Sequence, residues 1–245
     1  MKGQKEKNIN FVLRNQDKLF FMNIWISGTL NEVKQGAETK LVSAVVTNPT
    51  VIADWTKNGR SLEYVSKEVI DATGLPLYIQ LIGPTTSAFL REAEHLKNIS
   101  SMILPKLPST LAGLSAAKQL EANGFETLVT TVVSINQGYA CAAAGVTTIC
   151  PYLNRLQESG EDALQFIRNV AQIFKIQEVL TKIMPASVRT ISDIENALIN
   201  GCNGVIIFYP LFVKMFEHEV TSRSLADFEN DWKRIPYQFR DKPDA

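Results

Sequence analysis

Short apolar runs alternate regularly with longer amphipathic stretches along this chain, and this alternation constrains the fold more than any other feature. The apolar runs are rich in Val, Ile, Thr and aromatic residues, which is typical of parallel strands that are buried on both faces. They predict strands at residues 19–25, 42–48, 76–81, 101–107, 127–133, 147–153, 182–187 and 204–209.

The stretches between the runs show the period of amphipathic helices. The clearest covers 110–122, where Leu114 and Leu120 share one stripe, Ser109 or Thr110 can cap the start, and Asn123 precedes a terminating glycine. Further helices are expected at 62–73, 86–96, 135–144, 161–174, 191–200 and 210–219.

Strands that alternate with helices in this way predict an α/β fold, a (β/α)8 TIM barrel, and the 245 residues suit its typical length of roughly 250. A doubly wound sheet is the alternative, but no GxGxxG motif follows the first strand and no Walker A motif occurs. We expect an N-terminal extension at 1–18, the barrel at 19–221, and an additional C-terminal helix with a tail at 222–245. The apolar stripe of that helix, Leu225, Phe228 and Trp232, could pack on its own barrel or on a neighbouring subunit.

Composition excludes several classes of function. The 25 basic and 25 acidic residues balance, which argues against a nucleic-acid partner or an anionic membrane surface. No apolar stretch approaches the ~18 residues of a membrane span, and the polar, Lys-rich start does not resemble a secretory signal. Three cysteines without a CxxC motif and only two histidines favour a cytoplasmic protein with no metal site and no cofactor.

Lys106 is the most informative polar residue. It interrupts the apolar run 102–107, where strand alternation puts it on the same face as Met102 and Leu104. If that face is the barrel interior, loss of hydration lowers the pKa of the amine and leaves it neutral, as attack on a carbonyl requires. The alternative is a lysine at the strand end that extends its charge to solvent.

Several motifs in order give the chain a resemblance to the small transaldolase family, most of all to its fructose-6-phosphate aldolase branch. The match runs from about residue 19 to about residue 235. The motifs are TNPT at 47–50, KLPST at 106–110, TLVT at 127–130, PYLNR at 151–155, ASVR at 186–189, GC at 201–202 and FENDW at 228–232.

The resemblance implies a class I aldolase. Lys106 would form a Schiff base with the C2 carbonyl of a ketose phosphate such as fructose 6-phosphate. Breaking the C3–C4 bond then gives dihydroxyacetone and glyceraldehyde 3-phosphate. Tyr152, Gln80 and Thr130 would surround a water that moves protons.

The resemblance also implies how the substrate is held. Asn48 would hold a substrate hydroxyl, and Arg155, Ser187 and Arg189 would bind the phosphate, for which a guanidinium is a suitable donor. From the residues alone, each arginine could instead form a surface ion pair. The remaining polar groups could simply satisfy hydrogen bonds of the core.

Two positions bear on the activity within the family. True transaldolases tend to have Glu in place of Gln80 and Phe in place of Tyr152, so both residues favour the aldolase, whereas Arg189 favours a transaldolase. Asn23 stands where the family has a catalytic Asp in its first strand, and an alternative alignment puts Ile26 there.

These observations leave three functions open. The aldolase is the first, and the second is a transaldolase that passes a dihydroxyacetone unit between sugar phosphates. The third, suggested by Asn23, is a sugar-phosphate-binding relative without turnover. The resemblance further implies a homo-oligomer, a pentamer or a decamer.

Overall fold

A computed structural model describes residues 22–235. The expected extension at 1–18 and the first residues of the expected strand at 19–25 lie outside this range. Eight parallel strands form one sheet in the order β7-β6-β5-β4-β3-β2-β1-β8. Their bounds are β1 (Asn23–Ser27), β2 (Ala44–Val46), β3 (Leu77–Gln80), β4 (Ile103–Pro108), β5 (Leu128–Val132), β6 (Thr148–Pro151), β7 (Lys182–Ile183) and β8 (Gly204–Phe208).

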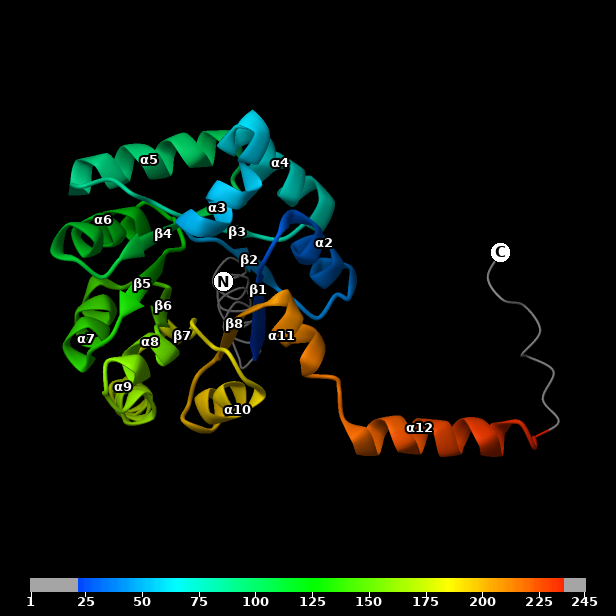
Figure 1. Ribbon diagram of the computed structural model, residues 1–245. Helices are drawn as coiled ribbons and strands as arrows, with labels where there is room; N and C mark the ends of the chain where they lie inside the picture. The colour runs from blue at the N-terminus through cyan, green and yellow to red at the C-terminus, as the bar shows by residue number, and fades with distance from the viewer. Residues whose placement is uncertain (1–21, 236–245) are drawn as a thin grey trace, which may run out of the picture.

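The sheet closes into a barrel. β8 pairs in parallel with β1 from Asn23↔Gly204 to Ser27↔Phe208. On the other side of β8, the main-chain N–H of Asn203 donates to the carbonyl of Ile183 at 2.9 Å. The fold is therefore the predicted (β/α)8 TIM barrel, with the helices arranged around the strands (Figure 1).

The helices follow the strands in the expected places. They are α2 (Leu30–Glu38), α3 (Pro49–Trp55), α4 (Leu62–Thr73), α5 (Thr86–Ile99), α6 (Leu111–Ala122), α7 (Ile135–Ala144), α8 (Leu153–Glu158), α9 (Ala163–Ile176), α10 (Ile191–Ile199), α11 (Tyr209–Lys214) and α12 (Glu219–Trp232). Side chains cap many of their first turns, as Thr110 does for α6 by accepting from the N–H of Gly113. Three helices, α2, α3 and α8, were not expected from the sequence, and each starts within three residues of the carboxyl end of a strand.

The core has two layers. The outer layer lies between strands and helices and contains residues such as Ile26, Leu107 and Val129. The inner layer fills the barrel with side chains of alternate strand positions, among them Trp25, Tyr78, Leu128, Cys150, Met184 and Ile206. The rings of Trp25 and Tyr78 stack with centroids 4.9 Å apart. The barrel interior is thus packed with apolar side chains except near the carboxyl ends of the strands.

The last helix stands apart from the barrel. α12 extends away from it beyond α11 (Figure 1), and none of its residues is buried. The side chains of the expected apolar stripe are exposed: Leu225 by 61%, Phe228 by 66% and Trp232 by 42%. Within residues 22–235, no helix is both long and apolar enough to cross a membrane.

Candidate active site

Lys106 lies inside the barrel. It is 3% exposed, and its Nζ donates to the main-chain carbonyl of Thr47 at 2.8 Å. Burial lowers the pKa of this amine, and the positive charge of Arg155 lowers it further, while Cys150 acts in the opposite direction. The side chain does not extend to solvent, so the amine is held in the environment that favours its neutral, nucleophilic form.

A cavity opens above Lys106 at the carboxyl ends of the strands. Its volume is about 670 Å³, within the usual range for small-molecule sites. The structure brings six of the residues predicted from the sequence to its walls: Asn48, Lys106, Tyr152, Arg155, Ser187 and Arg189.

Tyr152 and Thr130 form a hydroxyl pair beside this cavity. Tyr152 follows β6 directly, and its phenolic oxygen accepts a hydrogen bond from Oγ1 of Thr130 at 3.1 Å. Burial raises the pKa of the phenol, so Tyr152 stays protonated at neutral pH. The guanidinium of Arg155 lies over the Tyr152 ring, 4.9 Å from its centroid. Tyr152 is therefore a proton donor whose oxygen is already fixed by Thr130.

Gln80 and Asn48 occupy neighbouring strand ends. Gln80 pairs in register with Lys106 and comes two positions after the interior residue Tyr78, so it faces the barrel interior. It does not line the cavity itself. Asn48 caps α3, because its Oδ1 accepts from the N–H of Val51 at 3.0 Å. This leaves the Asn48 amide nitrogen as the donor available to a ligand.

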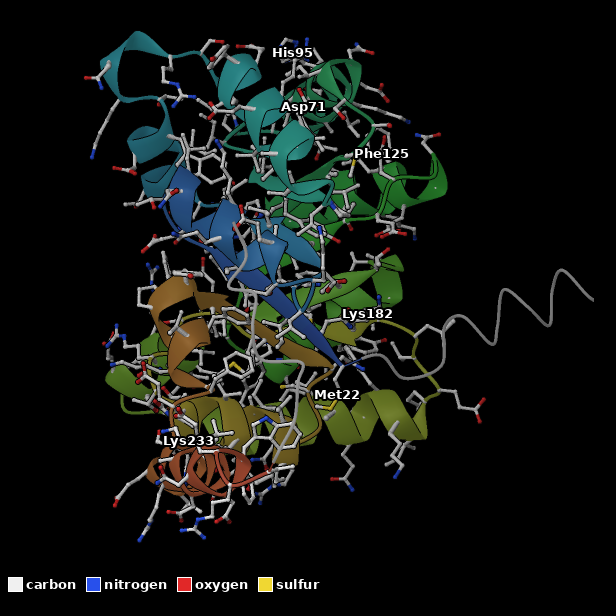
Figure 2. The ribbon with its side chains drawn as sticks, turned by 90° about the vertical axis from the view of Figure 1, so that its right-hand side faces the viewer. Met22, Asp71, His95, Phe125, Lys182 and Lys233 are labelled. Atoms are coloured by element: carbon white, nitrogen blue, oxygen red, sulfur yellow. The ribbon has the colours of Figure 1, made fainter. Side chains whose placement is uncertain are left out.

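The structure does not bring Asn23 into the site. Asn23 is the first residue of β1, and its Oδ1 accepts from the Ser43 hydroxyl. Figure 2 shows the preceding residue, Met22, on the same side of the barrel as Lys182, the first residue of β7. The catalytic role expected of Asn23 therefore does not fit its position, which is at the amino ends of the strands, away from Lys106.

The reason is a shift in the first strand. The sequence suggested 19–25, but pairing with β8 sets β1 at Asn23–Ser27. Ile26, the alternative alignment, packs in the outer layer. The β1 residue that lines the cavity is Ser27. The carboxyl end of β1 thus supplies a hydroxyl and no carboxylate.

The three expected phosphate ligands lie on two neighbouring segments. Arg155 is on α8, whereas Ser187 and Arg189 are in the loop before α10. Ser187 has a φ of 59°, which a residue with a Cβ adopts only where its surroundings enforce it. Arg189 forms an exposed ion pair with Glu158, with an N–O distance of 2.5 Å. The anion-binding groups are present, and one of them has a competing partner.

Further residues that were not predicted from the sequence also line the cavity. Thr29, Glu32 and Asp54 line it from the region after β1 and β2, and Ile206 and Phe208 line it from β8. Thr29 and Glu32 form a capping box at the start of α2. The pattern Thr-x-x-Glu was visible in the sequence and could have located this wall. In the range 22–235, no group of three or more His, Cys, Asp or Glu side chains is arranged to hold a metal ion.

Three comparisons relate this chain to known proteins. The sequence profile of the Transaldolase/Fructose-6-phosphate aldolase family matches residues 25–241. Two curated proteins named "Probable transaldolase", from Streptococcus pyogenes serotype M2 (strain MGAS10270) and serotype M5 (strain Manfredo), are each 34% identical over 200 residues. These alignments cover 82% of this chain and 92% of the relatives. The solved structure of a thiamine phosphate pyrophosphorylase from Pyrococcus furiosus matches with a TM-score of 0.51 at 9% identity, covering 76% of this chain and 85% of that one. This last likeness concerns the fold alone.

Proposed function

This chain belongs to the transaldolase/fructose-6-phosphate aldolase family, and within it we propose a class I aldolase that cleaves a ketose phosphate. The observation that carries the proposal is Lys106, a buried amine with a lowered pKa below a cavity of small-molecule size. A neutral amine in that position can attack a ketone.

The reaction follows from the chemistry of the amine. Lys106 adds to the C2 carbonyl of a substrate such as fructose 6-phosphate, and loss of water gives a protonated imine. The imine takes up the electron pair of the C3–C4 bond while the C4 hydroxyl loses its proton, which releases glyceraldehyde 3-phosphate. The remaining enamine is protonated at C3, and hydrolysis releases dihydroxyacetone and restores the amine.

We assign the proton transfers to Tyr152, Thr130 and Gln80 together with water. Tyr152 stays protonated, and because its oxygen accepts from Thr130, its own hydrogen is free to reach the cavity. β1 offers only Ser27 at this end of the barrel, so the chain has no first-strand carboxylate to share the task. This hydroxyl-and-amide relay favours protonation of the enamine and release of dihydroxyacetone.

Substrate binding is assigned to other residues that line the cavity. Arg155, Ser187 and Arg189 would hold the phosphate, and the amide nitrogen of Asn48 would donate to a hydroxyl near the Schiff base. In a TIM barrel, phosphate groups commonly bind at the carboxyl ends of the last strands, which is close to this location.

Reductive trapping tests the proposal directly. We expect borohydride with fructose 6-phosphate to add a three-carbon unit to Lys106, identified by peptide mass spectrometry. Lys106→Met should form no adduct and have no activity. If the parent protein binds fructose 6-phosphate but forms no adduct, the chain is a binding protein without turnover.

The second candidate is a transaldolase, as the names of the Streptococcus pyogenes relatives indicate for those proteins. The two functions differ in the fate of the three-carbon unit. Release of free dihydroxyacetone without an acceptor aldehyde supports the aldolase, whereas turnover that requires erythrose 4-phosphate supports the transaldolase.

We further propose a cytoplasmic homo-oligomer, a pentamer or decamer. The three cysteines Cys141, Cys150 and Cys202 are free and buried, as suits a reducing compartment. α12 exposes an apolar stripe that a second copy of the chain would cover.

A further inference from the structure

The candidate phosphate site is divided between two segments that must be held together. α8 carries Arg155, and the loop 186–190 carries Ser187 and Arg189. A phosphate can meet all three only if the distance between the segments is fixed. Two side chains that were not assigned to the site, Asn154 and Asp193, connect these segments.

Asn154 is the link from the side of α8. Its Nδ2 donates to the main-chain carbonyl of Ser187 at 2.7 Å, and its main-chain N–H donates to the same carbonyl at 3.1 Å. The two bonds hold the peptide that follows Ser187. They therefore help to enforce the left-handed backbone of that serine, whose φ is 59°.

Asp193 is the link from the side of α10. Its Oδ2 accepts from the main-chain N–H groups of Arg189 and Thr190, both at 3.0 Å, and from Nδ2 of Asn154 at 3.0 Å. Burial acts to raise the pKa of this carboxyl, but the hydrogen bonds from Asn154 and the main chain outweigh it and lower the pKa. Asp193 is thus ionised at neutral pH and accepts hydrogen bonds from the main chain of the loop.

The bonds form a closed chain. One oxygen of Asp193 joins the loop to Asn154, and Asn154 returns to the loop at Ser187. Asn154 is also the immediate neighbour of Arg155 on α8. Replacing either side chain would remove bonds that hold Ser187 in its left-handed conformation. It would also leave the distance between Arg155 and Arg189 less firmly fixed.

We propose that Asn154 and Asp193 are positioning residues that fix α8 and the loop 186–190 so that Arg155, Ser187 and Arg189 meet on one phosphate group. The inference rests on the proposed function, since it deepens the phosphate site assigned there. It goes beyond that assignment because neither Asn154 nor Asp193 lines the cavity.

The test compares phosphate binding with catalysis. Inorganic phosphate is titrated by calorimetry into the parent, Asn154→Ala and Asp193→Ala. Each substitution should weaken binding about tenfold, the scale of one lost hydrogen bond to a charged group. In the synthetic direction, KM for glyceraldehyde 3-phosphate should rise to a similar extent. With unphosphorylated glyceraldehyde, kcat and KM should change less than about twofold.

A conservative variant and a matched control separate positioning from stability. All three donors reach the same oxygen of Asp193, so the amide oxygen of Asp193→Asn can replace it, and its binding should stay within about threefold of the parent. Asp162→Ala removes a carboxylate that caps α9 by accepting from the N–H of Gln165, and it should leave phosphate binding unchanged. If Asn154→Ala fails to fold, Asn154→Ser, which is too short to bridge both partners, replaces it.

Several outcomes overturn the inference. They are a parent that does not bind phosphate, alanine variants that bind as tightly as the parent, and an equal loss for both aldehydes. A loss of binding in Asp162→Ala would also count against it. Failure of the proposed function is recognised separately, because it is the absence of a borohydride adduct on Lys106 in the parent.

Discussion

Lys106 sets the chemistry at the scale of single residues. Its nitrogen is hydrogen-bonded to a main-chain carbonyl and the residue is only 3% exposed, so the charged form is poorly solvated. The pattern of the sequence showed that a lysine interrupts an apolar run, but it could not show which face of the strand is the interior. Pairing with β3 and β5, which places Lys106 beside Gln80 and Leu128, decides this.

The lowered pKa of Lys106 predicts the pH dependence of adduct formation. The neutral amine is the nucleophile, so the trapping rate should fall as the pH drops through the lowered pKa. It should reach its plateau below 10.5, the ordinary pKa of a lysine. The rate of borohydride-trapped adduct measured between pH 6 and 11 checks this. A rate that continues to rise up to the ordinary lysine pKa would contradict the burial argument.

Tyr152→Phe should separate Schiff-base formation from proton transfer. Removing the phenol hydroxyl should lower kcat for release of dihydroxyacetone by about 100-fold, the lower end for general acid–base catalysis. Lys106 keeps its position, so the trapped adduct should still form. Thr130→Val, which removes the bond to the Tyr152 oxygen and leaves the phenol hydroxyl in place, should have a smaller effect. Equal losses of adduct and release in Tyr152→Phe would assign Tyr152 to binding instead.

The predicted residues that line the cavity share one property, and the position of Asn23 shows what the sequence could not predict. Asn48, Tyr152 and Arg155 follow strands whose ends are marked by polar motifs, so their end of the barrel could be predicted. Asn23 lies in an apolar run that extends in both directions, and a run of that kind does not specify its own register. Pairing with β8 and β2 fixes the register.

At the scale of elements, the sequence predicted the strands well and the short helices poorly. The long helix α6 was recognised by its period and cap, whereas α8 has six residues, too few to show a period. β7 is also shorter than expected, with two residues, because only Lys182 and Ile183 pair with β6 as a ladder. Ala186 joins Tyr152 through a single isolated bridge.

Gly204 controls the seam between β8 and β1. Its φ is 153°, and a Cβ there would lie 2.0 Å from the carbonyl oxygen of Asn23. Gly204→Ala should therefore lower the free energy of unfolding by about 3 kcal/mol, as strain and overpacking combine. Denaturant unfolding measures this.

Gly145→Ala is the matched control for Gly204. Gly145 also has a positive φ, 76°, but a Cβ there meets nothing within 4 Å. The substitution should cost only about 1 kcal/mol, the usual penalty at a left-handed helix cap. If both variants lose the same stability, the seam is not as tight as the contact implies.

At the scale of the whole molecule, the barrel and α12 differ in how far their apolar side chains are buried. The barrel buries its apolar residues, while α12 presents Leu225, Phe228 and Trp232 to solvent. The helical spacing of these three residues could be recognised in the sequence. Whether it would face its own barrel could not be read from the pattern, and in the structure it does not pack there, since none of its residues is buried.

Phe228→Glu should dissociate the proposed oligomer. A charge in the middle of the stripe opposes burial against a second copy, so light scattering should give a mass near the 27.3 kDa of one chain. The parent should give a multiple of that mass. Asp227→Asn, next to the stripe on an exposed position, serves as the control and should keep the parent mass. A parent that is already monomeric, or a variant with unchanged mass, would rule out this role of α12.

The hydrogen bond between Lys106 and the Thr47 carbonyl limits how a ketone can approach the amine. One amine hydrogen points at that oxygen, so the lone pair is confined to directions that lead away from Thr47. A ketone must then approach the nitrogen from the side away from Thr47. When the protonated imine forms, the nitrogen still carries one hydrogen and can keep its bond to the carbonyl. One main-chain oxygen can thereby hold the nitrogen in place from the free amine through to the enamine.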